Sequence, residues 1–98
     1  MSASLSTHVL DTERGAPAAG VRVELLRGHE LLADGTTDED GRVSSLAVSL
    51  EAGAYRLVFH PDSRFFRRVE LELVLDEDRH YHVPLLVSAF QCTSYRGS

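Results

Sequence analysis

Residues 69–75 read Val-Glu-Leu-Glu-Leu-Val-Leu and decide the fold class. Apolar residues occupy every second position, and successive side chains of a β-strand point to opposite faces. One face of this strand is therefore apolar, whereas the other carries Glu70 and Glu72. A strand of this kind covers a hydrophobic core with one side and meets water with the other.

The same two-residue period recurs along most of the chain. Clusters of Gly, Pro and Asp interrupt it at intervals of roughly 8–12 residues, which is the spacing of an antiparallel sandwich or barrel. We therefore predict an all-β, antiparallel β-sandwich of seven or eight strands. The predicted strands cover residues 5–11, 21–27, a segment from 31, 55–59, 69–75, 81–87 and a segment from 92.

Three local features qualify this pattern. Gly41 follows an acidic turn and can take a positive φ. Pro84 has no N–H donor, which favours an edge strand or a bulge at that point. Leu46 and Leu50 are spaced i, i+4, as on a helix, but the neighbouring serines weaken this interpretation. The fold thus contains at most one short helix, over residues 43–50.

Length, charge and cysteine count exclude several classes of protein. The 98 residues predict a single domain over residues 1–98. The net charge of −5 disfavours nucleic-acid binding. No apolar run is long enough for a membrane helix, and the N-terminus lacks the features of a secretory signal, so we expect a cytoplasmic protein. Cys92 is the only cysteine, which excludes an internal disulfide, and every basic residue is arginine, which excludes a Schiff-base lysine.

Three histidines are candidates for chemistry. His80 and His82 are two positions apart and therefore share one face of a strand. His8 faces outward if its neighbours Thr7 and Val9 face the core. A histidine can act as a general base near neutral pH, and three of them can hold zinc, so both uses stay open.

Arginine and the C-terminal tail add further polar groups. Arg42 follows the turn, where a guanidinium can bind a carboxylate or an enolate-like oxygen through two parallel hydrogen bonds. Residues 95–98 place a phenol, a guanidinium, a hydroxyl and the terminal carboxylate within four positions. This tail directly follows a predicted strand, so it can be held in place.

Five segments together resemble one known family. Residues 6–12 read STHVLDT, residues 15–21 read GAPAAGV and residues 37–42 read TDEDGR. Residues 80–88 read HYHVPLLVS and residues 95–98 read YRGS. In this order and spacing they resemble the transthyretin-like 5-hydroxyisourate hydrolases. The closing tetrapeptide separates these hydrolases from transthyretins, which carry thyroid hormone on the same fold.

The resemblance implies a fold, an activity and an assembly. It implies a transthyretin-like sandwich that hydrolyses 5-hydroxyisourate to 2-oxo-4-hydroxy-4-carboxy-5-ureidoimidazoline in urate catabolism, without a metal or an organic cofactor. It also implies a homotetramer, a dimer of dimers, with sites between subunits. It assigns catalysis to His8, Arg42, His82 and Ser98, and substrate binding to His8, Arg42, Tyr95, Arg96 and Gly97, with His80 in support.

The chain departs from the family pattern in three places. Residues 60–68 form a shorter segment than the helix and loop that the family usually has there. Ala89 replaces a proline that is usual in the family. Gln91 and Cys92 stand where the family usually has small or aromatic residues. Two other functions stay open beside the hydrolase. One is a non-catalytic carrier on the same fold, and the other is a zinc-binding domain that uses His8, His80 and His82.

Overall fold

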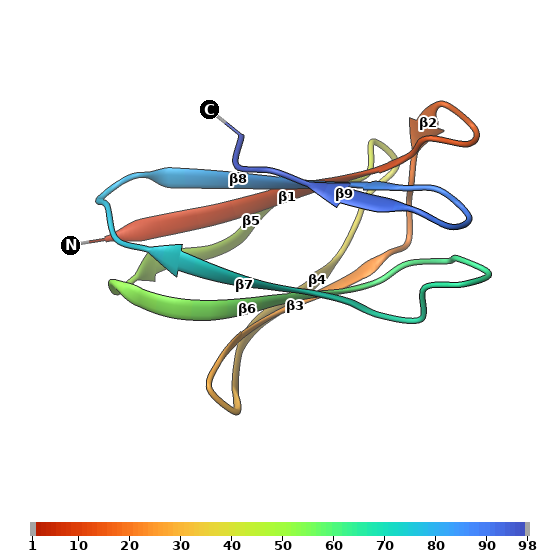
Figure 1. The fold of residues 1–98 in the computed structure, drawn as a ribbon. Coiled ribbons are helices and arrows are strands. Elements are labelled where there is room, and N and C mark those ends of the chain that lie inside the picture. The colour runs from red at the N-terminus through yellow and green to blue at the C-terminus, as the bar shows by residue number, and fades with distance from the viewer. Residues whose placement is uncertain (1, 98) are drawn as a thin grey trace.

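The computed structural model describes residues 2–97, and within them it contains only strands and their connecting turns. The alternating segments form strands where the sequence predicts them, as Figure 1 shows. The strands are β1 (Ala3–Asp11), β2 (Ala16–Pro17), β3 (Arg22–Arg27), β4 (Glu30–Thr36), β5 (Arg42–Leu50), β6 (Gly53–His60), β7 (Val69–Leu75), β8 (His80–Val87) and β9 (Cys92–Ser94).

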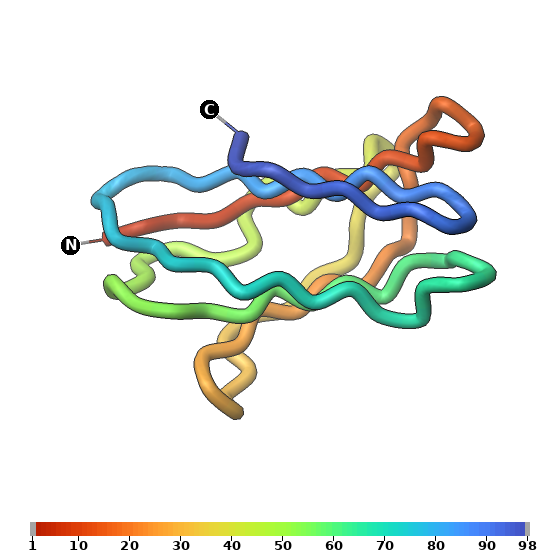
Figure 2. Tube along the Cα trace, viewed as in Figure 1, coloured from red at the N-terminus to blue at the C-terminus, as the bar shows by residue number. Residues whose placement is uncertain are grey.

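The strands form two facing sheets, which confirms the predicted all-β sandwich (Figure 1). One sheet has the order β2-β1-β8-β9, with β5 also paired to β1. The second sheet has the order β4-β3-β6-β7 and is antiparallel throughout. In the first sheet β1 and β8 run parallel, which brings the two ends of the sequence side by side. Figure 2 shows the chain after β9 continuing beside β8.

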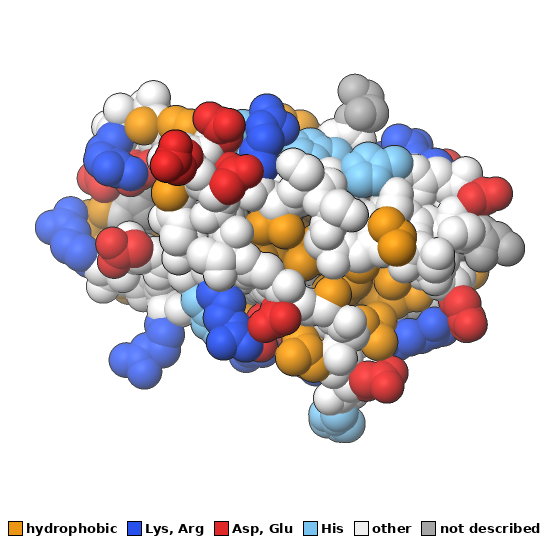
Figure 3. All heavy atoms as spheres, turned by 180° about the vertical axis from the view of Figure 1, so that it is seen from behind, with side chains coloured by type: hydrophobic (Ala, Val, Ile, Leu, Met, Phe, Trp, Pro, Cys, Tyr) orange, Lys and Arg blue, Asp and Glu red, His pale blue; other side chains and the backbone are white. Residues whose placement is uncertain are grey.

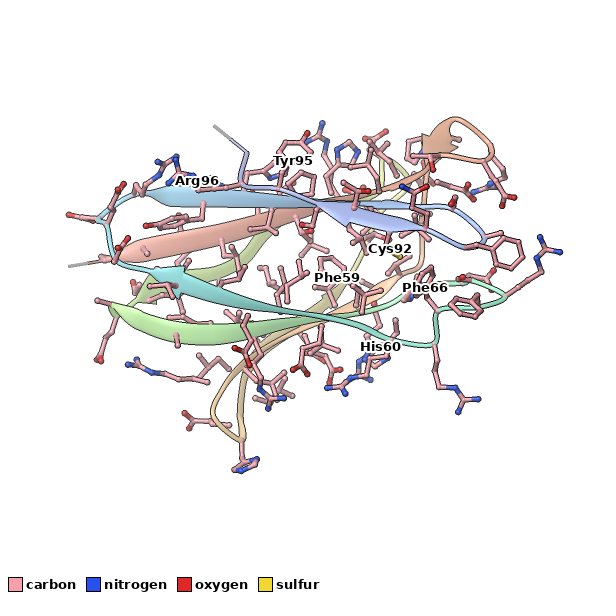
Figure 4. All side chains as sticks on the ribbon, viewed as in Figure 1. Phe59, His60, Phe66, Cys92, Tyr95 and Arg96 are labelled. Carbon is pink, nitrogen blue, oxygen red and sulfur yellow. The ribbon has the colours of Figure 1, made fainter. Side chains whose placement is uncertain are left out.

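The apolar faces of both sheets meet in one hydrophobic core. Leu5 and Val9 from β1 contribute to it, as do Leu57 and Phe59 from β6, and all four are fully buried. Figure 4 shows Phe59 between the sheets. Thr7 is buried there as well, and its hydroxyl donates to the carbonyl oxygen of Val83 at 2.6 Å. Thr7 thus enters the core without an unpaired polar group.

The structure decides two local features that the sequence left open. Residues 43–50 belong to strand β5, not to a helix, because they pair with β1 through two register shifts. Leu46 and Leu50 are both buried although Val48 between them is 63% exposed, because a register shift interrupts the alternation of β5 there. Pro84 does not lie on an edge strand, because β8 lies between β1 and β9. It sits where the pairing with β9 stops, beyond Leu85 and Ser94, so the missing N–H is tolerated.

The shortened segment after β6 is a loop. Ser63 organises it: its hydroxyl accepts hydrogen bonds from the backbone N–H groups of Phe65 and Phe66. The short connection carries the chain directly into β7, and the sandwich closes without the extra helix. No helix in the described residues is long and apolar enough to cross a membrane.

Candidate active site

His8, Arg42 and His82 lie on the outer face of the five-stranded sheet. Strand register arranges them in rows across that face. In the first row His8 on β1 lies opposite Arg42 on β5. In the next row Ser6 on β1 lies opposite His82 on β8, and a bridge joins His82 to Gly97 of the tail. Figure 3 shows histidine side chains gathered on this surface, and we call the part formed by His8, Arg42 and His82 the histidine platform.

Strand alternation points His8 outward, as the sequence predicts. Its neighbours Thr7 and Val9 are fully buried on the core side, whereas His8 is half-buried on the other. The rings of His8 and His82 are 6.5 Å apart between centroids and tilted by 40°. This separation leaves two imidazoles facing one small area of the surface, which is the geometry needed to contact a single small molecule.

The acidic turn places Arg42 beside His8. Asp38 accepts hydrogen bonds from the backbone N–H groups of Asp40 and Arg42, both at 2.9 Å. Gly41 has φ +74°, a conformation that glycine adopts without strain. Its carbonyl oxygen accepts from the N–H of Val9 at 2.7 Å, which ties the turn to β1. The Arg42 guanidinium makes no ion pair with other residues of the described part of the chain, 2–97, so it can bind ligand oxygens.

The environment of His82 favours its neutral form. Burial lowers the pKa of His82 below its ordinary value of 6.5, and the positive charges of Arg42, His8 and His80 lower it further. A neutral imidazole can accept a proton, which a general base must do. The backbone N–H of Gly97 donates to the carbonyl oxygen of His82 at 2.7 Å, so the tail is fastened beside this ring.

One side chain in this cluster did not emerge from the sequence as a candidate. Ser6 is only 6% exposed, although it lies on the outer face. Its hydroxyl oxygen is 2.8 Å from Nε2 of His80 and 2.8 Å from Nδ1 of His82. The hydroxyl of Ser4 lies 2.6 Å from Nδ1 of His80. The parallel pairing of β1 with β8 creates these contacts, and the only signal for Ser6 in the sequence was its place in the STHVLDT motif.

Tyr95 and Arg96 lie apart from the histidine rows. Both line a groove of about 480 Å³ that runs along β7, and the residues that line it within the described range 2–97 do not include His8, Arg42 or His82. Tyr95 is 59% exposed, and Figure 4 shows both residues on the tail beyond β9. Ser98, a predicted catalytic residue, lies outside the described residues.

The histidine rows give no support to a zinc site. Among residues 2–97, no three His, Cys, Asp or Glu side chains are grouped in a way that could hold a metal ion. Nε2 of His80 and Nδ1 of His82, which could otherwise bind zinc, face the hydroxyl of Ser6 instead. The arrangement therefore favours hydrogen-bond and acid–base chemistry.

Two hydrolases and one transthyretin are similar to this chain in sequence or in structure. The chain is 38% identical to 5-hydroxyisourate hydrolase 2 of Rhizobium meliloti, over 99% of this chain and 98% of the relative. The structure of 5-hydroxyisourate hydrolase from Klebsiella pneumoniae superposes with a TM-score of 0.90 at 37% identity, covering 98% of this chain and 99% of the other. Sea bream transthyretin in complex with thyroxine superposes with a TM-score of 0.88 at 26% identity, covering 96% and 94%.

These likenesses extend over nearly the whole length of the chain. The sequence profile of the HIUase/Transthyretin family matches residues 5–97, which include both histidines of the platform and most of the tail. The chain therefore belongs to the HIUase/Transthyretin family.

Proposed function

We propose that this protein is an enzyme that hydrolyses 5-hydroxyisourate to 2-oxo-4-hydroxy-4-carboxy-5-ureidoimidazoline in urate degradation. The observation that carries the proposal is the convergence of His8, Arg42 and His82 on one outward face. Relatives at about 38% identity over the full chain bear the name 5-hydroxyisourate hydrolase. The substrate is a small, oxygen-rich heterocycle, which suits two imidazoles and a guanidinium.

His82 serves as the general base in this proposal. Its lowered pKa keeps the ring neutral at pH 7, and Ser6 occupies Nδ1, which leaves Nε2 to face a water molecule. The base takes a proton from water while the water oxygen bonds to the ring amide carbon. The C–N bond then breaks, the nitrogen takes a proton, and a carboxylate replaces the amide.

Arg42 and His8 act on the two ends of the reacting amide. The Arg42 guanidinium binds substrate oxygens and stabilises the negative charge that develops on the carbonyl oxygen. His8, beside it in the same row, supplies the proton to the leaving nitrogen. The proposed site includes Ser98, Tyr95, Arg96 and Gly97 as the residues that close and orient it.

The assembly we propose is a homotetramer, a dimer of dimers, with sites between subunits. In a single chain the histidine platform lies outside the three grooves described for residues 2–97, and its two imidazoles are half-buried on the outer face. Hydrolytic sites gain electrostatic strength when bulk water is excluded. A neighbouring subunit over the platform supplies that exclusion. A cytoplasmic location remains a prediction from the sequence.

A carrier function is the second candidate, favoured by the likeness to sea bream transthyretin bound to thyroxine. The sandwich does not distinguish the two functions, because both kinds of protein superpose closely on this chain. The histidine platform favours the hydrolase over the carrier, because a carrier does not need a general base.

The decay of freshly prepared 5-hydroxyisourate, followed by ultraviolet absorbance with and without the protein, separates these functions. The hydrolase function predicts decay that accelerates in proportion to protein concentration. Decay at the uncatalysed rate, together with binding of an aromatic ligand, would favour the carrier.

A further inference from the structure

Ser6 lies between two imidazoles and can donate only one proton. A hydroxyl has one O–H donor and two acceptor lone pairs. Its oxygen is at 2.8 Å from Nδ1 of His82 and at 2.8 Å from Nε2 of His80. If Ser6 donates to one ring, it must accept from the other to keep both hydrogen bonds. The protonation of the two rings is therefore linked through this hydroxyl.

The linkage continues to a second serine. Nδ1 of His80 lies 2.6 Å from the hydroxyl of Ser4, so the order of contacts is His82, Ser6, His80, Ser4. Ser6 is buried and His82 is half-buried, whereas His80 is exposed. The series thus runs from the predicted base to a ring in contact with solvent.

Two arrangements satisfy every hydrogen bond in the series. In the first, both rings carry their proton on Nδ1, so His82 donates to Ser6 and Ser6 donates to His80. In the second, both rings carry it on Nε2 and every donation is reversed. Neutral His82 and His80 therefore adopt the same tautomer in either arrangement.

We propose that Ser6 and His80 form a proton relay behind His82, which carries the proton taken from water to the exposed edge of the sheet. This proposal rests on the proposed function, in which Nε2 of His82 accepts that proton. The Nδ1 proton of His82 then passes to Ser6, and the hydroxyl proton of Ser6 passes to Nε2 of His80. His80 releases its Nδ1 proton towards Ser4 and solvent. One proton enters at His82 and one leaves at His80, so the charge balances.

The groups around His82 explain why a proton relay would help the reaction. Arg42 on β5, His8 on β1 and His80 on β8 all face this ring and disfavour its positive charge. A protonated His82 beside Arg42 is therefore costly, and removal of its Nδ1 proton returns the ring to the neutral form with its proton on Nε2. Loss of that Nε2 proton to solvent, with return of one proton through Ser4, His80 and Ser6 to Nδ1, resets the base for the next water. In this role Ser6 and His80 are positioning residues that act through His82.

The relay predicts a specific pattern in steady-state kinetics. Ser6→Ala and His80→Gln are each expected to lower kcat by about 10- to 100-fold, the range for residues that support a catalytic group, with KM unchanged. Added imidazole buffer is expected to restore much of the rate by removing the proton directly. Ser6→Thr retains the hydroxyl and keeps kcat within about threefold. Thr36→Ala removes an exposed hydroxyl from the other sheet and serves as the matched control.

Imidazole nitrogen NMR tests the same inference without substrate. The neutral rings of His80 and His82 are expected to show the same tautomer in the wild type and to lose this match in Ser6→Ala. Opposite tautomers in the wild type would overturn the relay. Wild-type kcat in both Ser6→Ala and His80→Gln, in a protein that hydrolyses 5-hydroxyisourate, would overturn it as well. A wild type without hydrolase activity would instead refute the proposed function, and the tautomer test would still decide the linkage between the rings.

Discussion

At the scale of single residues, the proposed chemistry depends on the electrostatics of His82. Burial is the largest cause of the lowered pKa of this imidazole, and the nearby charges of Arg42, His8 and His80 lower it further. Of these, Arg42 keeps its charge at every relevant pH. The guanidinium therefore has two effects in the proposed site, because it binds substrate oxygens and holds the base neutral.

Arg42→Gln is expected to raise the pKa of His82 towards 6.5, because it removes a neighbouring positive charge. Titration of His82 by NMR measures this directly. In the wild type, the unfolded chain binds a proton at His82 more readily than the folded chain, so stability falls as the pH drops below 6.5 and through the lower folded pKa. In Arg42→Gln the folded pKa of His82 lies closer to 6.5, so the loss of folding stability spans a narrower pH range. A pKa of His82 that is unchanged in Arg42→Gln would contradict the assigned cause.

Gly97 gives a second test at this scale. A Cβ atom at Gly97 would lie 2.9 Å from the carbonyl oxygen of His82 and 3.1 Å from Cδ2 of its ring. Gly97→Ala must therefore move either the tail or the imidazole. We expect activity to fall by on the order of 10- to 100-fold, because small displacements of catalytic groups are costly, with little change in Tm. Kinetics and thermal denaturation on the same samples check this, and unchanged activity would show that the tail does not position His82.

At the scale of elements, the turn before β5 controls the alignment of Arg42 with His8. Gly41 has a positive φ, and a Cβ atom at this position would clash with the carbonyl oxygen of Val9. Both the conformation and the close approach therefore require glycine. The turn is tied to β1 through backbone hydrogen bonds, so any shift there moves the first row of the site.

Gly41→Ala is expected to destabilise the fold by about 2 kcal/mol or more and to lower Tm by about 8 °C or more. Gly15→Ala is the matched control, because Gly15 also has a positive φ but a Cβ atom there would meet nothing within 4 Å. That control retains only the conformational cost of about 1 kcal/mol. Equal losses in the two variants, measured by chemical denaturation, would show that the contact with β1 is unimportant.

The sequence predicts the strands better than it predicts their partners. Alternation in residues 69–75 and 21–27 is a local property, so it can be read directly, and the outward direction of His8 follows from the same rule. The parallel pairing of β1 with β8 depends on contacts between distant segments. For that reason the sequence did not single out Ser6, and it favoured an edge or a bulge for Pro84, which lies on the inner strand β8 where the pairing with β9 stops. The sequence left residues 43–50 open between a strand and a short helix, because two register shifts interrupt the alternation of β5.

Some of the predicted site residues meet in the single chain, and others do not. The family motifs led to His8, Arg42 and His82, and the structure brings these three together on one face. Tyr95 and Arg96, from the same motifs, line a groove along β7 in the single chain. Their role in binding stays a prediction, because an assembly in which they reach a shared site involves contacts that one chain does not contain.

At the scale of the whole molecule, the small core and the histidine platform both point to assembly. A chain of 98 residues buries a modest fraction of its surface on folding, and partner chains often complete such domains. The edge strand β7 exposes Val74, which is 69% accessible in the single chain. Exposed edge strands with apolar residues readily pair with another chain.

Light scattering coupled to size-exclusion chromatography is expected to give a mass four times that of the 10.8 kDa chain. Dilution should lower specific activity once the tetramer dissociates, because the platform then loses the subunit that covers it. An active monomer with undiminished specific activity at low concentration would contradict the shared site.

In the proposed function the histidine platform on the outer sheet hydrolyses 5-hydroxyisourate, and His82 is its base. The most direct test is the turnover rate of 5-hydroxyisourate at saturating substrate for the wild type and for His82→Ala, with folding of the variant verified by circular dichroism. The proposed function predicts rapid turnover by the wild type and a loss of about 10²- to 10⁴-fold in the variant, the usual contribution of a general base. Full turnover by folded His82→Ala would contradict it.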